Sequence, residues 1–140
     1  MITSLFAVSP VHRRQGGAPM QLRYVIIFVS DLGRSVAFYR DLLGMQVREK
    51  SRTSAELDAN GVTLALHRAH VDTPEHHHAP MLAGSCRLGF VIQDLEGIHR
   101  RLTDAGVPCV APPETQFDLR VALYEDPDGV NLTLAEPVAV

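Results

Sequence analysis

Residues 126–134, Asp-Pro-Asp-Gly-Val-Asn-Leu-Thr-Leu, are a variant copy of residues 58–66, Asp-Ala-Asn-Gly-Val-Thr-Leu-Ala-Leu. A second pair of similar stretches lies upstream, at residues 24–32 and 87–95, and both members end in Asp-Leu. A unit that occurs only twice does not make a solenoid, which needs at least about three repeats to bury a core. The repeat therefore predicts a pseudo-twofold molecule with a site between its two copies.

The composition is that of one globular domain. The chain has 140 residues and a net charge of −3, which is long enough for one core and gives no sign of a basic nucleic-acid-binding surface. No apolar stretch approaches the roughly 18 residues of a membrane span. Cys86 and Cys109 lack the spacing of a metal or redox motif, so we expect reduced thiols in a cytoplasmic protein.

Local signals predict the order βαβββ in each copy. In the first copy, the apolar run 22–29 indicates a strand, Ser30 and Asp31 a helix cap, and Asn60-Gly61 a hairpin turn. The predicted helices span residues 33–43 and 95–105. The predicted strands span residues 22–29, 45–50, 53–58, 62–68, 86–93, 108–111, 117–125 and 130–136.

These elements divide the chain into an arm and one domain. We expect residues 1–19 to form an N-terminal arm or extension, and residues 20–140 to form the domain. Its two modules cover about residues 21–69 and 86–137. The linker between them, residues 70–85, contains two prolines.

Alternation along the repeated strands predicts one core face and one lined face, because successive side chains of a strand point to opposite sides. In the first strand, Val25, Ile27 and Val29 form an apolar set that belongs against a helix. The opposite faces of the repeated strands carry a mixed set that is typical of a lined cavity, namely Tyr24, Ile26, Phe28, Thr63, Ala65, His67, Arg87, Gly89, Val91, Asn131, Thr133 and Ala135.

Two segments, residues 29–45 and 125–132, resemble the vicinal oxygen chelate superfamily. This superfamily contains glyoxalase I, bleomycin-resistance proteins, extradiol dioxygenases and fosfomycin-resistance transferases. The resemblance extends over about residues 21–137. It implies an α+β fold in which two tandem βαβββ modules form a curved, cup-shaped mixed sheet with the helices on its convex face. It also implies a homodimer, and leaves open whether the modules pair side by side or by exchange between chains.

The resemblance assigns metal ligands to four strand positions, which are occupied here by Tyr24, Ala65, Arg87 and Thr133. Metal-binding relatives carry histidine or glutamate there, since divalent ions prefer imidazole nitrogen and carboxylate oxygen. Alanine offers no donor, and arginine is a permanent cation. We therefore expect neither a metal nor another cofactor. The consecutive histidines 76–78 lie in the linker, where adventitious binding is the simpler interpretation.

An arginine on the floor of a cup suits a carboxylate, phosphate or other anionic ligand. Arg87 is therefore our candidate anchor, although internal pairing with an acidic residue is the alternative. The further candidates for ligand binding are Tyr24, Phe28, His67, Tyr124, Asn131 and Thr133. We interpret Asp126 and Asp128 as turn residues, and His99 as a surface residue of the second helix.

Three functions remain open at this point. The first is a metal-free protein that binds a polar or anionic small molecule, with no nucleic-acid or membrane partner. The alternative is a metal-dependent glyoxalase-like lyase or dioxygenase with non-standard ligands, such as His67 together with histidines of the linker. The third is a protein whose function is dimerisation, with an occluded cup.

Overall fold

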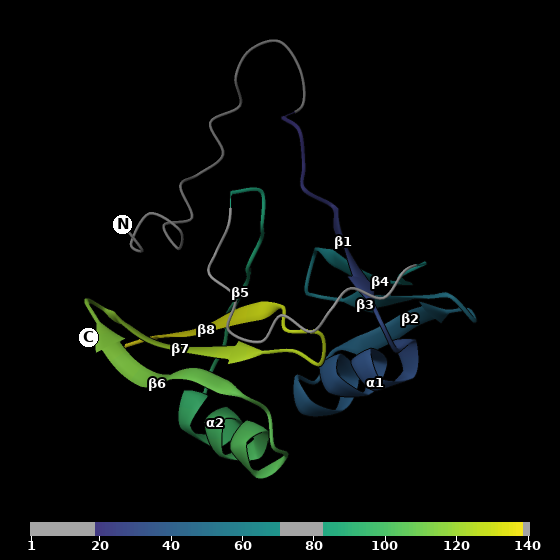
Figure 1. The fold of residues 1–140 in the computed structure, drawn as a ribbon. Helices are drawn as coiled ribbons and strands as arrows, with labels where there is room; N and C mark the ends of the chain where they lie inside the picture. The colour runs from purple at the N-terminus through teal and green to yellow at the C-terminus, as the bar shows by residue number, and fades with distance from the viewer. Residues whose placement is uncertain (1–18, 71–82, 139–140) are drawn as a thin grey trace.

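The computed structural model describes residues 19–70 and 83–138 (Figure 1). Residues 1–18 of the proposed arm and the histidines at 76–78 lie outside the described residues. The first module consists of β1 (Tyr24–Val29), α1 (Leu32–Ala37), the π-helical turn η2 (Phe38–Leu42), β2 (Gln46–Lys50), β3 (Ser54–Asp58) and β4 (Thr63–Arg68). The second consists of β5 (Leu88–Val91), α2 (Leu95–Asp104), β6 (Cys109–Gln116), β7 (Leu119–Glu125) and β8 (Asn131–Pro137).

Each module has one four-stranded mixed sheet of the same topology. The strand orders are β1-β4-β3-β2 and β5-β8-β7-β6, and in both sheets the first pair is parallel and the other pairs are antiparallel. The predicted fold class, two βαβββ modules in an α+β protein, is confirmed. The sheets stay separate within the chain, and β1 and β5 each lie at a sheet edge.

The structure confirms the helix cap predicted at Asp31 and the hairpin turn predicted at Asn60-Gly61. The carboxylate of Asp31 accepts a hydrogen bond from the backbone of Arg34, and Asp94 does the same for Gly97. Asn60 and Gly61 both have positive φ, at 61° and 106°, which a two-residue hairpin turn of the primed type requires.

Two elements differ from the sequence prediction. The first helix continues after Ala37 as a π-helical turn, so residues 33–43 do not form one regular helix. The strand predicted at 108–111 extends to Gln116, because Pro112 and Pro113 lie at bulges of an edge strand, where proline is tolerated.

Both helices cover the same side of the two sheets (Figure 1). Val29, Leu66 and Leu132 are fully buried there, and they pack in one cluster that includes residues of both modules. A second cluster lies between α2 and the second sheet. No helix in the described part of the chain is long and apolar enough to cross a membrane.

A buried carboxylate joins the modules. Asp126, in the turn before β8, accepts a hydrogen bond of 2.7 Å from the Tyr39 hydroxyl of η2. It also accepts backbone hydrogen bonds from Asp128 and Val130, which confirms its role in the turn. The neighbouring Asp128 accepts hydrogen bonds from the backbone and the hydroxyl of Ser30. Polar contacts between the modules therefore form on the helix side of the sheets.

Burial raises the pKa of Asp126 above its ordinary value of 3.8, although its hydrogen bonds oppose the shift. Burial and the adjacent carboxylate also raise the pKa of Tyr39, so that its hydroxyl stays protonated and donates.

We expect Asp126→Asn to be tolerated and to become relatively more stable as the pH rises from 4 to 7. The asparagine oxygen can still accept the two backbone hydrogen bonds, while its amide donates to Tyr39. Between pH 3.8 and the raised pKa of Asp126, the folded wild type keeps a proton that the unfolded chain has lost. The stability of the wild type therefore falls as the pH rises through this range. Urea unfolding of both proteins across this range measures the difference.

Asp41→Asn is the matched control, because Asp41 is exposed and a hydrogen bond from Arg40 lowers its pKa. Its stability relative to wild type should change with pH in the opposite direction. A difference for Asp126→Asn that does not vary with pH would contradict the assignment of a raised pKa.

Candidate functional site

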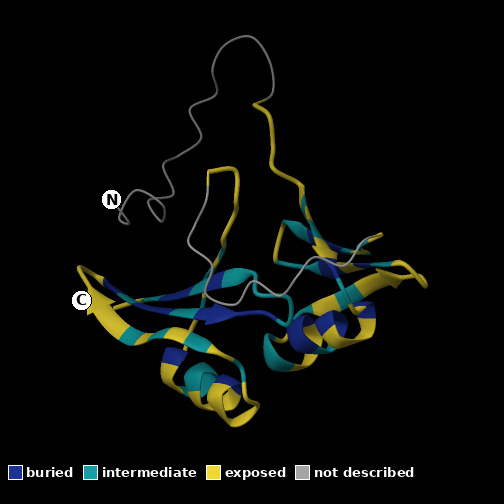
Figure 2. Cartoon of the chain, in the orientation of Figure 1, coloured by how far each residue is buried: buried dark blue, intermediate teal, exposed yellow. Residues whose placement is uncertain are grey.

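The concave face of the first sheet carries a stripe of exposed apolar side chains. Met20, Leu22, Tyr24, Ile26 and Phe28 alternate along β1 and the segment before it, and they are between 41% and 100% exposed. Figure 2 shows that the lead-in to β1 is exposed and projects away from the helices. Because alternate residues of an extended chain share a face, the stripe is continuous.

A groove of about 650 Å³ lies on the same face. Its floor includes Ala65, which is almost fully buried and pairs with Ile26 of β1 and Glu56 of β3. The small alanine side chain gives the groove depth. The other lining residues are Arg23, Tyr24, Arg48, Asp58, Gly61, Val62, Thr63 and His67.

Charged side chains from β2 and β3 line this groove, and sequence reasoning missed them. The Arg48 guanidinium lies 3.0 Å from the Asp58 carboxylate. The hydrogen bond from Arg48, together with backbone hydrogen bonds from Asn60 and Gly61, lowers the pKa of Asp58. The alternation of β3, with Ala55 and Leu57 buried between polar residues, was the signal that could have found them.

Two of the predicted ligand-binding residues meet at the other end of the groove. The rings of Phe28 and His67 contact edge to face, with centroids 6.2 Å apart. Their strands pair in register, which places Phe28 directly opposite His67. Tyr24 lies on the same face, opposite Thr63. The structure thus brings Tyr24, Phe28 and His67 to one sheet.

The remaining predicted residues belong to the second sheet. Arg87 is exposed immediately before β5, and among the described residues no carboxylate pairs with it. Thr133 and Asn131 are partly buried on β8, and Thr133 pairs with Gly89 and Leu123.

Tyr124 does not lie in the cup. Its side chain is fully buried in the cluster under α2, because it faces the helix rather than the open side of the sheet. Its hydroxyl lies 2.8 Å from Nδ1 of His99, which corrects the interpretation of His99 as a surface residue. The pKa of Tyr124 is raised to about 12, mainly by burial and to a smaller extent by the nearby Cys109 and Glu96.

Comparison with known proteins places the fold and the family. Residues 21–134 match the family model of the Glyoxalase/Bleomycin resistance protein/Dioxygenase superfamily. The chain belongs to this superfamily. It is 30% identical over 125 residues to the uncharacterized protein YaeR of Escherichia coli K12, covering 83% of this chain and 95% of YaeR.

Two further comparisons cover most of the chain. Glutathione transferase FosA of Serratia marcescens is 27% identical over 115 residues, covering 81% of this chain and 78% of FosA. A glyoxalase/dioxygenase structure from Nostoc punctiforme has a TM-score of 0.77 and 18% identity, covering 90% of this chain and 99% of that chain. The structural likeness supports the fold alone.

The four residues that the resemblance assigns to metal positions do not have the chemistry to hold a divalent ion. Tyr24 and Ala65 lie on the first sheet, while Arg87 and Thr133 lie on or beside the second. Together they offer a phenol, a methyl group, a guanidinium and a hydroxyl, without imidazole or carboxylate. Within residues 19–70 and 83–138, no three His, Cys, Asp or Glu side chains converge to hold a metal.

We expect untagged protein, purified without chelators, to contain no stoichiometric Mn, Fe, Ni or Zn by elemental mass spectrometry. A triple variant, His76→Ala/His77→Ala/His78→Ala, separates adventitious binding by the consecutive histidines from a site in the cup. Stoichiometric metal that survives in this variant would show that the cup ligands have been assigned wrongly.

Proposed function

We propose that this protein binds a polar or anionic small molecule in the cup formed by its concave sheet faces, without the superfamily's metal ion. The observation that carries the proposal is the groove of about 650 Å³ on the first sheet. Its volume is within the range of small-molecule sites, and apolar, aromatic and charged groups converge in it.

The second sheet supplies the rest of the proposed cup. Its face turned away from α2 carries a small apolar cluster in which Leu119, Val121 and Ala135 are buried and Leu123 is partly buried, and Thr133 pairs with Leu123 beside them. Arg87 stands at the end of this sheet and would receive an anionic group of the ligand.

A homodimer would bring these two faces together. Within one chain, the edges of β1 and β5 remain unpaired, and the apolar stripe on β1 is open to solvent. A monomer rarely exposes such a surface, and unpaired edges favour pairing with another chain. We infer that the first sheet of one copy faces the second sheet of another. This exchange between chains is favoured over side-by-side pairing because the contacts through Asp126 lie on the helix side.

The free thiols of Cys86 and Cys109 suit a reducing compartment, so we expect the protein to act in the cytoplasm. The metal-dependent alternative is favoured by one observation, the similarity to glutathione transferase FosA. The metal measurement described above decides between the two.

A thermal-shift screen of small carboxylates, phosphates and sulfonates tests ligand binding. We expect at least one compound to raise the melting temperature of wild type. Arg87→Ala should weaken the binding of that compound about tenfold, because the substitution removes a charged hydrogen bond between arginine and the anion. Arg100→Ala, an exposed arginine on α2, is the control. Equal shifts in wild type and Arg87→Ala for every hit would remove Arg87 from the site.

The proposed dimer is tested with Leu22→Asp, which places a charge in the stripe beyond the groove. Sedimentation should show a dimer for wild type and a dimer dissociation constant raised at least about tenfold for the variant, because a buried unpaired charge is costly. Val110→Asp, at an exposed apolar residue of β6, should leave the dimer intact. A monomeric wild type would contradict the shared cup.

A further inference from the structure

The groove on the first sheet has an order along its length that narrows the class of ligand. Strand pairing orders the side chains of this sheet face in three rows: Tyr24, Thr63 and Asp58 in the first, Ile26, Ala65 and Glu56 in the second, and Phe28, His67 and Ser54 in the third. The first two rows and His67 line the groove, and Phe28 lies beside His67 at its end. Neighbouring rows are two residues apart along each strand, so the first and third rows are about 13 Å apart.

The end of the groove at the first row has a net positive charge, because Arg23 and Arg48 line it together with Asp58. The Arg48–Asp58 ion pair is internally neutral. Arg23 also lines this end and is exposed, and the structure gives its guanidinium no carboxylate partner within the residues it describes. Arg23 therefore offers hydrogen-bond donors and a positive charge to a bound molecule.

The middle row has the opposite charge. Glu56 is exposed, lines the groove, and is not paired with a cation in the part of the chain that is described. Beside it, Ala65 keeps the floor low and apolar. An anionic group would be repelled from this row, whereas an apolar spacer would fit over the alanine.

The third row is aromatic. Phe28 is 64% exposed, and its edge-to-face contact with His67 leaves ring surface available to a ligand. Aromatic rings pair well with such edges and faces. Along its length, the groove thus presents a positively charged end, a negatively charged middle row and an aromatic end.

We propose that the ligand of this groove is an elongated aromatic anion, with its anionic group at Arg23 and its ring at Phe28 and His67. This inference rests on the proposed function and adds the ligand's class and direction: Arg23 would contact the anionic group from the first sheet, and Arg87 would contact it from the second sheet of the shared cup. Glu56 acts as a specificity determinant. Its carboxylate repels the anionic group of any ligand that is too short to place this group past the middle row, at Arg23. Short aromatic acids cannot reach both ends.

The test uses four probes with full-length protein in titration calorimetry. 6-Phenylhexanoate combines a ring, a spacer and a carboxylate. 6-Phenylhexanamide lacks the charge, hexanoate lacks the ring, and benzoate lacks the spacer. We expect wild type to bind 6-phenylhexanoate at least about fivefold more tightly than each of the other three, as one exposed ion pair or one aromatic contact supplies about that factor.

Two variants must then lose different preferences. Arg23→Gln should abolish the preference for the carboxylate over the amide and retain the preference for the ring. Phe28→Ala should abolish the preference for the ring and retain the preference for the carboxylate over the amide. Phe28→Leu keeps an apolar side chain, in case the alanine variant is misfolded, and should give an intermediate result. Glu56→Gln should strengthen benzoate binding most among the four probes.

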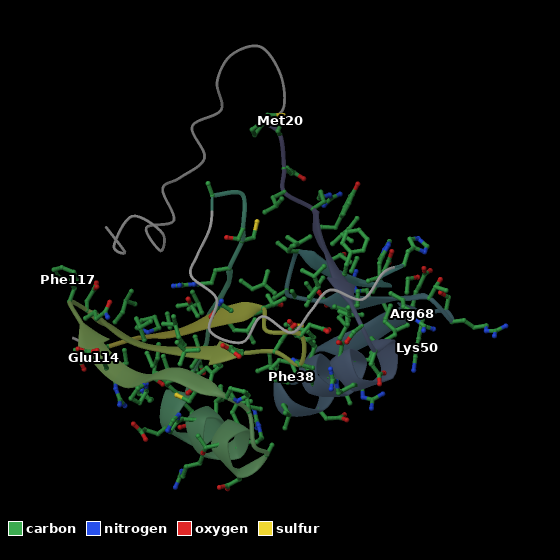
Figure 3. All side chains as sticks on the ribbon, viewed as in Figure 1. Met20, Phe38, Lys50, Arg68, Glu114 and Phe117 are labelled. Carbon is green, nitrogen blue, oxygen red and sulfur yellow. The ribbon has the colours of Figure 1, made fainter. Side chains whose placement is uncertain are left out.

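The controls are Arg100→Gln on α2 and Phe117→Ala, an exposed phenylalanine that Figure 3 places at the far end of the second module. Neither should change the order of the probes. If wild type binds all four probes equally, or if Arg23→Gln and Phe28→Ala lose the same preference, the inference is wrong. Hits in the anion screen that depend on Arg87 would still support the proposed function, so the two failures are distinguishable.

Discussion

The buried carboxylate of Asp126 is the constraint on which the arrangement of the modules depends. It accepts hydrogen bonds from Tyr39 in the first module and from two backbone groups of its own turn. A buried charge is costly unless such donors surround it, so the carboxylate is satisfied only when η2 lies against the turn before β8. One side chain therefore defines both a local turn and a contact between segments that are far apart in the sequence.

This contact determines which surfaces remain available for function. The polar contacts and the shared apolar cluster hold the modules together on the helix side. The edges of β1 and β5 and the apolar stripe of the first sheet are left exposed. The residues that stabilise the chain and those proposed to bind a ligand thus lie on opposite sides of the same sheets, as strand alternation allows.

Alternation and repetition made most of the fold predictable. They located the strands and separated the buried Val29 and Leu66 from the open Phe28. Tyr124 was assigned to the wrong face because β7 is apolar on both sides, and only its pairing with Leu132 shows that it faces the core. Pairing register depends on distant segments, and the contact of His99 with Tyr124 depends on how α2 packs. Neither is encoded in a local pattern.

The position of Ala65 connects the expected absence of metal ligands with the proposed binding. A ligand side chain there would project onto the concave face, whereas alanine leaves that space to the groove. In the proposed metal-free mode of binding, recognition would come from the charged and aromatic side chains that line or adjoin the groove. Such contacts are each weak in water, and excluding water strengthens them. A cup closed by a second sheet would provide that exclusion, which makes assembly and binding parts of one mechanism.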